Sequence, residues 1–296
     1  MTGFNEYAPL SRVVLGPVRD AFASAERIDR EWRTLNFTAP PDLERAIDQH
    51  AAFAAAIAAD GARIEELSDA GGLTLDAVYV RDASIVTPRG VVLCRMGKPA
   101  RADEPASQAR LFEAIGVPIA GTIQAPGCLE GGDVVWFDRH TVAVGRGYRT
   151  NDAGIAQLGA LVGPGVEVVV VPLPHHRGPD DVFHLMSILS PVDEDLTVVY
   201  SPLMPVPFRD WLIARGITLV EVPDEEFASM GANVLAIGPR RALMLEGNPV
   251  TRARLEAAGA DVRTLDGSEI SLKGGGGPTC LTRPLARADT SRRPHG

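Results

Sequence analysis

The sequence predicts a mixed α/β fold built as a closed ring of similar units, and two observations support this. A pattern of strand, turn, strand, helix and closing strand recurs along the chain. Each copy takes roughly fifty residues, and five copies account for most of the 296 residues, which is typical of closed or stacked arrays. We therefore predict one domain over residues 1–285, followed by a flexible tail at 286–296 that lacks apolar periodicity.

The first unit, residues 11–67, shows the pattern in a loose form. Residues 12–15 are apolar and predict a strand, and the Ala-rich segment 41–59 predicts a long helix. Residues 63–66 are expected to form the closing strand.

The next three units repeat the whole pattern, with short polar or glycine-containing turns between paired strands. The predicted strands are 83–86, 91–94 and 117–120 in the second unit, 133–137, 141–144 and 166–171 in the third, and 184–189, 197–200 and 217–222 in the fourth. The predicted helices are 105–115, 152–161 and 206–214.

The fifth unit shows the pattern most clearly. Residues 233–237 and 242–245 predict a hairpin around a Gly-Pro turn. Residues 249–258 predict a helix that Gly259 ends, and residues 261–265 predict the closing strand.

Composition excludes several classes of function. The 29 basic and 38 acidic residues give a net charge of −9, which argues against a general nucleic-acid binder and is compatible with a cationic substrate. Cys94, Cys128 and Cys280 are an odd number of widely spaced cysteines, as expected of reduced thiols in a cytosol. The sequence contains neither a signal-peptide pattern nor an apolar run of membrane-spanning length, so we expect a cytoplasmic protein without a membrane partner.

Cys280 follows four consecutive glycines in the segment GGGGPTCLT. Glycine runs let the backbone pass close to another group, which here could be a ligand. A cysteine in such a place is either a nucleophile or a small buried hydrophobe, and the segment alone leaves both readings open.

Polar residues also stand at the openings of three units, in the segments YVRD, CLEGGD and FHLMS. If the units form a ring, these openings converge on its axis. Asp82, Glu130 and His184 would then approach Cys280 despite their distance in sequence. Such a set satisfies the requirements of cysteine nucleophilic catalysis.

The segments YVRD, LEGGD, FHLMS and GGGGPTCLT, in this order, resemble those of the guanidine-modifying enzyme superfamily. This superfamily has the pentein fold and includes arginine deiminases, amidinotransferases and dimethylarginine dimethylaminohydrolases. The resemblance implies a five-bladed α/β propeller of ββαβ repeats with pseudo-fivefold symmetry. It also implies a hydrolase that acts on guanidino carbons through a covalent cysteine thiouronium intermediate.

The resemblance implies a role for each residue of the set. Cys280 is the expected nucleophile, and His184 the expected acid for the departing amine and base for the attacking water. Glu130 would orient His184, and Asp82 would hold the guanidinium by paired hydrogen bonds. By the same resemblance, Asp76 would bind the substrate's α-amino group. Its α-carboxylate would be bound by Arg101 and Arg149, for which an exposed loop arginine is the alternative.

Met186 points to the substrate. Deiminases and amidinotransferases carry a second carboxylate two residues after the histidine, where this chain has Met186, as in the dimethylarginine dimethylaminohydrolase branch. We therefore expect methylated arginine to yield citrulline and methylamine or dimethylamine. Arg81 and the GGPTCL loop look more like deiminases and amidinotransferases, so arginine, citrulline, agmatine and amidino transfer remain alternatives.

Other readings compete with this one. The residues His175, His176, Asp180, Asp181 and His184 are metal-ligand types without a fixed spacing. Cys128 could be redox-active, and a non-enzymatic pentein that binds ribosomes would have the same fold. The glycine run is not a phosphate loop because no GK[ST] follows it. We expect neither metal nor cofactor, because the covalent cysteine route needs none. A homodimer is compatible with the sequence, which selects no oligomeric state.

Overall fold

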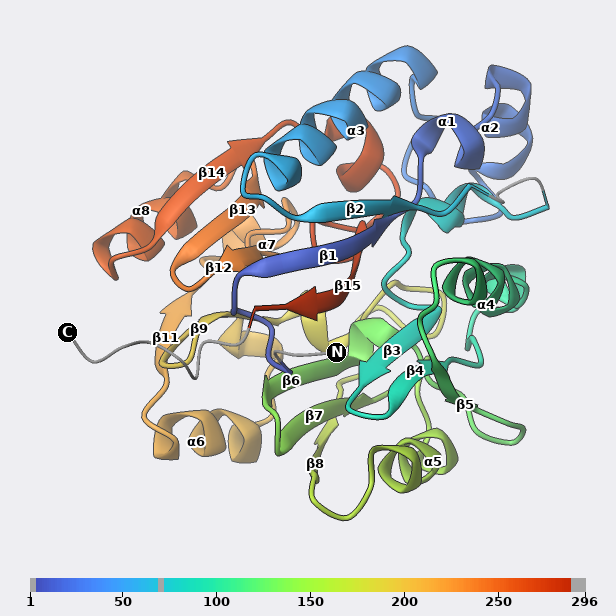
Figure 1. Cartoon of the computed structure of the whole chain (residues 1–296). Coiled ribbons are helices and arrows are strands. Elements are labelled where there is room, and N and C mark those ends of the chain that lie inside the picture. Colours follow the sequence, from blue (N-terminus) through green and yellow to red (C-terminus); the bar gives the residue numbers. More distant parts are fainter. Residues whose placement is uncertain (1–3, 69–71, 289–296) are drawn as a thin grey trace.

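The computed structural model describes residues 4–68 and 72–288, and these form a mixed α/β fold with five three-stranded sheets. The mixed α/β class predicted from the sequence is confirmed. Figure 1 shows the sheets placed around the middle of the molecule, with most helices on the outside.

In each sheet the middle strand pairs antiparallel with one neighbour and parallel with the other. The strand orders are β15-β1-β2, β3-β4-β5, β6-β7-β8, β11-β10-β9 and β12-β13-β14. The strands are β1 (Leu10–Leu15), β2 (Arg63–Glu66), β3 (Ser84–Thr87), β4 (Gly90–Leu93), β5 (Ile119–Thr122), β6 (Val134–Asp138), β7 (Thr141–Arg146), β8 (Glu167–Pro172), β9 (Leu189–Asp193), β10 (Leu196–Val199), β11 (Thr218–Glu221), β12 (Leu235–Gly238), β13 (Arg241–Leu245), β14 (Asp261–Leu265) and β15 (Thr282–Arg287).

A helix precedes the parallel strand of each sheet, because a parallel connection needs a long crossover. These helices are α3 (Leu43–Ala58), α4 (Glu104–Ala114), α5 (Asp152–Val162), α6 (Val206–Ala214) and α8 (Pro249–Ala257). The shorter helices α1 (Val18–Ala21), α2 (Ala25–Glu31) and α7 (Asp224–Phe227) had no counterpart in the sequence prediction. None of the helices in the described ranges combines the length and apolar character needed to cross a membrane.

The sheet that contains β1 is completed from the other end of the chain. Strand β15 pairs antiparallel with β1, with Leu10 opposite Arg287 and Leu15 opposite Thr282. This corrects the predicted start of the tail, since Ala286 and Arg287 belong to β15 and Arg287 is buried. Residues 289–296 of the predicted tail lie outside the described residues.

The predicted strand at 184–189 is wrong at its start. His184 precedes a tight 3₁₀ turn at Leu185–Ser187, and β9 begins only at Leu189. The Ser187 hydroxyl accepts the His184 backbone N–H at 3.0 Å, which satisfies that donor within the turn. His184 is therefore presented by a turn next to the end of a sheet.

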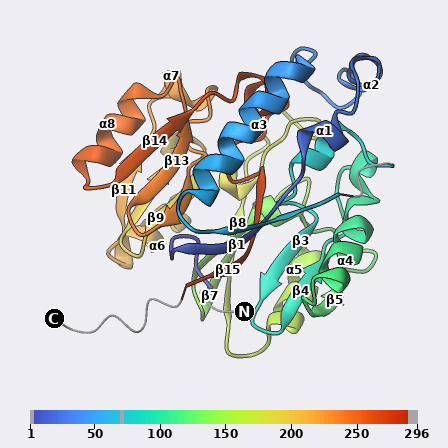
Figure 2. The same cartoon turned by 45° about the horizontal axis from the view of Figure 1, so that its top comes forward.

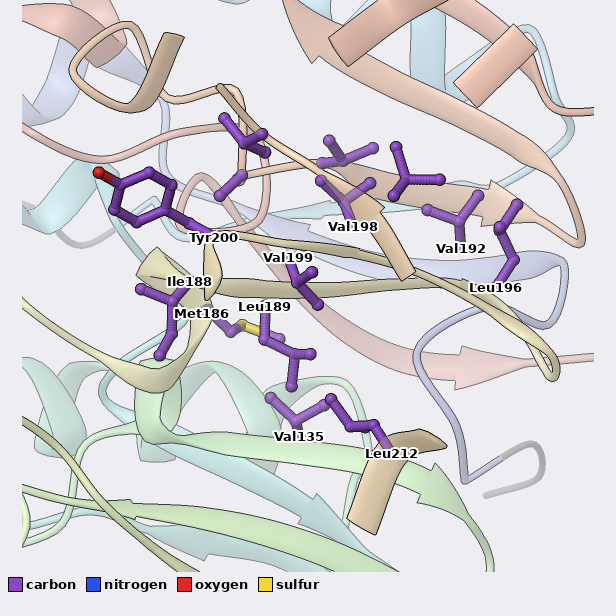
Figure 3. Packing of buried hydrophobic residues seen from close by; sticks show 14 of the residues in the cluster. Val135, Met186, Ile188, Leu189, Val192, Leu196, Val198, Val199, Tyr200 and Leu212 are labelled. Atoms are coloured by element: carbon purple, nitrogen blue, oxygen red, sulfur yellow. The ribbon is translucent and has the colours of Figure 1, made fainter. Parts of the chain in front are cut away.

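The largest apolar cluster packs three sheets together, those of β6-β7-β8, β11-β10-β9 and β12-β13-β14. Figure 3 shows Val135 of β6 and Leu212 of α6 facing Leu189 and Val199, all fully buried. At about 25 cal/mol per Å² of buried apolar surface, such side chains contribute about 1.5–3 kcal/mol each. This packing fixes the sheet ends from which Glu130 and His184 project.

Candidate active site

The four predicted reactive residues come from loops that lead into four different sheets. Asp82 precedes β3, Glu130 precedes β6, His184 precedes β9 and Cys280 precedes β15. One side-chain oxygen or nitrogen from each of Asp82, Glu130 and His184 lies within 4.8 Å of the other two. His184, Cys280 and Asp82 also line one small cavity, so the structure brings together all four residues.

Glu130 and His184 form a buried hydrogen-bonded pair. The His184 Nε2 lies 2.8 Å from the Glu130 Oε2, and the Arg149 Nη1 donates to the same oxygen at 2.9 Å. The other Glu130 oxygen accepts the backbone N–H groups of Gly97 and Lys98 at 2.8 and 3.1 Å. This carboxylate is therefore bonded through both oxygens and fixed in orientation.

The electrostatics of the pair favour its charged form. Burial would raise the pKa of Glu130, but the bond from His184 and the charge of Arg149 outweigh it and hold this pKa well below its usual range. Burial would lower the pKa of His184, but the carboxylates of Asp82, Asp133 and Glu130 raise it to about 9. At neutral pH the site holds an imidazolium beside a carboxylate.

Asp82 lies close to the pair of Glu130 and His184 and is held as an anion. Its oxygens accept the Gly132 backbone N–H at 2.9 Å and the Arg101 Nη1 at 2.5 Å. Burial would raise the pKa of Asp82, but the charges of His184 and Arg101 lower it. Arg101 also donates twice to Glu104 at 2.7 Å, so it is buried between two carboxylates.

The residues expected to bind the substrate's amino-acid group line the same small cavity but have protein partners in this structure. Asp76 pairs with Lys98 at 2.6 Å, and Arg149 pairs with Glu130. Arg101 and Arg149 are 4% and 6% exposed, so the alternative of exposed loop arginines is wrong. Their role toward a substrate stays a prediction.

Cys280 is half-buried, and its thiol is held by neutral groups. The Asn233 Nδ2 lies 3.6 Å from the sulfur, and the Thr279 hydroxyl lies 3.9 Å from it. Burial and then the charge of Asp82 raise the pKa of the Cys280 thiol. Without a bound cation, the thiol is therefore protonated at neutral pH.

The glycine run packs closely against side chains. A Cβ at Gly274 or Gly276 would overlap Tyr79, and one at Gly277 would overlap Asn233. Gly274, Gly275 and Gly276 also line the small cavity. The sequence predicts that the glycine backbone passes close to another group, and in the structure that group is the side chains of Tyr79 and Asn233. These contacts fix the position of the backbone before Cys280.

Two cavities meet at the reactive residues. The small one has a volume of about 20 Å³, and its charged lining includes Asp76, Asp82, Arg101 and Arg149. The second, of about 240 Å³, is lined by apolar residues such as Met186, Phe183 and Phe227, and by Asp180 and Asp181. Cys280 and His184 line both cavities, which places them at the junction.

The loop of the alternative metal site does not bring His175 and His176 together as ligands. The His175 Nδ1 lies 2.6 Å from the Tyr148 hydroxyl, and His176 packs against Phe183 and Phe227. Among the described residues, the potential ligands that come together are Asp82, Glu130 and His184, of which the last two are hydrogen bonded to each other.

Sequence reasoning missed several supporting residues. Glu104 could have been found, because it stands three residues after Arg101 and directly before the predicted helix 105–115. Asp133 holds the turn after His184 by accepting the Leu185 backbone N–H at 3.0 Å, and burial raises its pKa to about 6. Asn233 gave no sequence signal, since its contact with Thr279 and Cys280 joins chain segments 46 and 47 residues apart.

A family model described as "N,N dimethylarginine dimethylhydrolase, eukaryotic" matches residues 22–287. The chain belongs to the dimethylarginine dimethylaminohydrolase family. Within the guanidine-modifying superfamily, this makes it a hydrolase of carbon–nitrogen bonds in linear amidines, as the sequence predicted.

Individual relatives agree with this family. The N(G),N(G)-dimethylarginine dimethylaminohydrolase of Streptomyces coelicolor is 32% identical over 238 residues, which is 80% of this chain and 84% of that one. The Pseudomonas aeruginosa enzyme of the same name, solved as a cysteine-to-serine mutant with citrulline, has a TM-score of 0.71 at 22% identity and covers 93% of this chain and 98% of its own. An amidinotransferase of Microseira wollei has a TM-score of 0.78 at 16% identity, with 97% of both chains covered. At these identities the two structures show the shared fold.

Proposed function

We propose that the chain hydrolyses Nω-methylated arginine to citrulline and methylamine or dimethylamine. The observation that carries this proposal is the junction at Cys280 and His184. An anionic Asp82 lies on the side of the small polar cavity, and the buried, apolar Met186 lies on the side of the larger one. A methylated guanidinium matches both sides, because its delocalised positive charge suits Asp82 and its apolar methyl groups suit Met186.

Binding and activation are coupled in this mechanism. Asp82 accepts hydrogen bonds from unsubstituted N–H groups of the guanidinium, while its methyl groups lie toward Met186. The substrate's positive charge beside Cys280 offsets the effect of Asp82 on the thiol and lowers its pKa. The nucleophile is thus generated in the complex.

The covalent steps follow from the charged pair. The sulfur of Cys280 bonds to the guanidinium carbon, and the carbon–nitrogen bond to the methylated amine breaks as His184 gives that nitrogen a proton. Neutral His184 then takes a proton from water, whose oxygen bonds to the same carbon. The carbon–sulfur bond breaks, which releases citrulline and restores the thiol. Glu130 stabilises His184 whenever it is charged.

We propose that Asp76 binds the α-amino group and that Arg101 and Arg149 bind the α-carboxylate. All three line the small cavity, and a fork of arginine donors suits a carboxylate. In this structure the two arginines already pair with Asp82, Glu104 and Glu130. The substrate's carboxylate must therefore replace part of these ion pairs when it binds.

The five sheets, each with the same pairing pattern, support the proposal of a five-bladed propeller in a single domain. A closed ring explains why loops before β3, β6, β9 and β15 meet at one place. Because the mechanism needs a free Cys280 thiol, we also propose a reducing compartment such as the cytoplasm.

A substrate panel tests the function. Purified chain is incubated with arginine, monomethylarginine, dimethylarginine, citrulline and agmatine, and products are identified by mass spectrometry. We expect citrulline and the methylated amine from the methylated substrates, with no product from the Cys280→Ser variant at an unchanged unfolding midpoint. Turnover by that variant, or faster release of ammonia from arginine than of methylated amine, contradicts the proposal.

A further inference from the structure

A separate cavity of about 30 Å³ lies away from the reactive residues, where the N-terminal segment enters between β15, β6 and β3 (Figure 1). Its buried lining includes Glu6, Arg81, Trp136, Arg283 and Arg287. None of Cys280, His184, Glu130 and Asp82 lines it. A buried water needs about 10–15 Å³ of such space, so this cavity has room for a small ion.

The charges around this cavity do not balance. Arg81, Arg283 and one carboxylate, Glu6, line it, and the Glu6 Oε2 accepts the Arg81 Nη1 at 3.2 Å. Burial, and then the charge of Arg81, lower the pKa of Arg283 to about 9. Buried charges in proteins are normally paired, so an excess of positive charge here calls for an anion.

The cavity also has donors that lack acceptors. Within the part of the chain that the structure describes, the Arg81 Nη2, the Arg283 Nε and the Trp136 Nε1 are buried and have no hydrogen-bond partner. Each belongs to a residue that lines the cavity. An unmet buried donor costs about 1–3 kcal/mol, and three around one small space are unusual in a native fold.

We propose that this cavity is a binding site for a single halide ion, chloride under ordinary conditions. The ion would accept hydrogen bonds from the unpartnered donors of Arg81, Arg283 and Trp136 and would offset the excess positive charge.

Arg81 connects this site to the nucleophile. Its backbone N–H donates to the Cys280 carbonyl at 3.1 Å, and its Nε donates to the Thr279 carbonyl at 3.0 Å. The side chain that would bind the ion therefore also holds the backbone of the Cys280 loop. The ion would stabilise this loop whatever substrate the active site takes, so the inference does not depend on the proposed function.

Bromide tests the site directly, because its anomalous scattering locates it. Crystals of the full chain grown without halide and soaked in sodium bromide are expected to show an anomalous peak in the cavity, in contact with Arg81 and Arg283. In solution at constant ionic strength, replacing gluconate by bromide or chloride is expected to raise the unfolding temperature in a saturable way. A cavity with water alone, or bromide only at the surface, overturns the proposal.

Variants separate a bound ion from a general salt effect. Trp136→Phe keeps an aromatic side chain and removes one donor, and we expect the apparent Kd for bromide to rise about tenfold, since hydrogen bonds to charged groups are strong. Arg283→Met should abolish the cavity peak. The exposed Arg252→Met is the matched control and should keep wild-type affinity. If Arg283→Met does not fold, Trp136→Phe decides, and an unchanged affinity in that variant contradicts the site.

Discussion

At the scale of single residues, the charged state of His184 decides the chemistry. Its pKa is raised to about 9, above that of an ordinary histidine, by the carboxylates that surround it. Its ion pairs therefore stabilise the fold fully below pH ~6.5, the pKa of an unfolded histidine, and this contribution is lost as the pH rises through about 9.

We predict that kcat/KM for the methylated substrate falls as the pH rises through about 9, because His184 loses the proton it must give to the amine. In Glu130→Gln the hydrogen-bonding carboxylate is gone, so the alkaline limb should move to lower pH by about one unit or more. A pH–rate profile of both proteins measures this. Glu256→Gln, at an exposed ion pair, is the control, and an unmoved limb in Glu130→Gln contradicts the assignment.

A second prediction concerns the Cys280 thiol. Asp82 is the main charged neighbour that raises its pKa, so Asp82→Asn should lower this pKa and speed alkylation of Cys280 by iodoacetamide at neutral pH. The same variant should lose turnover by about a hundredfold or more, because the neutral asparagine side chain lacks the negative charge that binds the guanidinium cation. Mass-spectrometric alkylation rates against pH give the answer. Slower alkylation with retained turnover would contradict both roles, the effect of Asp82 on the thiol pKa and its binding of the guanidinium.

At the scale of elements, the site depends on the turns that precede the strands. Tight 3₁₀ turns contain Asp76 and Asp133, and a third follows His184. In such turns the backbone can direct a side chain across the end of a sheet. Helix α5 contributes through its N-cap, because the Asn151 side chain accepts the N–H groups of both Gly154 and Cys128 and so ties the loop before Glu130 to the helix.

The glycine run gives a prediction at this scale. In Gly276→Ala the new Cβ would overlap the Tyr79 ring, so we expect a loss of about 1–3 kcal/mol in unfolding free energy and a displaced Cys280 with reduced kcat. Gly165→Ala is the matched control, because a Cβ there meets no atom within 4 Å. Denaturant unfolding and kcat measure both effects. Equal behaviour of the two variants would show that the loop tolerates the added methyl group.

At the scale of the whole molecule, the two ends of the chain share one sheet. Strand β15 pairs with β1 along its whole length, and Arg287 donates to the carbonyls of Ala8 and Ala236. Figure 2 shows β15 beside β1, from the opposite end of the colour scale. The sheet of the first unit is therefore complete only when β15, the last strand, has paired with β1.

Truncation tests this closure. A chain ending at Leu281 keeps Cys280 but lacks β15, and we expect it to lose cooperative unfolding and activity, because β1 is left with an open edge. A chain ending at Ala288 is the control and should keep the wild-type unfolding midpoint. Circular dichroism during heating compares them, and a cooperative transition in the shorter chain would contradict the closure.

The sequence determined the units, since turn residues and apolar alternation are local properties. The parallel strand β14 and the helix α6 lie at the predicted residues, whereas the start of β9 was missed because the Ser187 cap outweighs the apolar character of residues 185–189. Strand β15 was missed because its partner β1 lies at the other end of the chain, and no local signal can show such pairing.

The sequence by itself therefore determined the fold class, the family resemblance and the four residues Asp82, Glu130, His184 and Cys280, because their motifs are short and contiguous. Only the tertiary structure decided which charges face each other. The pairing of Arg101 with Asp82, the contact of Asn233 with Cys280 and the buried arginines around Glu6 join segments that only the packed sheets bring together. Coulomb energies and hydrogen bonds depend on distance in space, and the order of residues along the chain does not specify that distance.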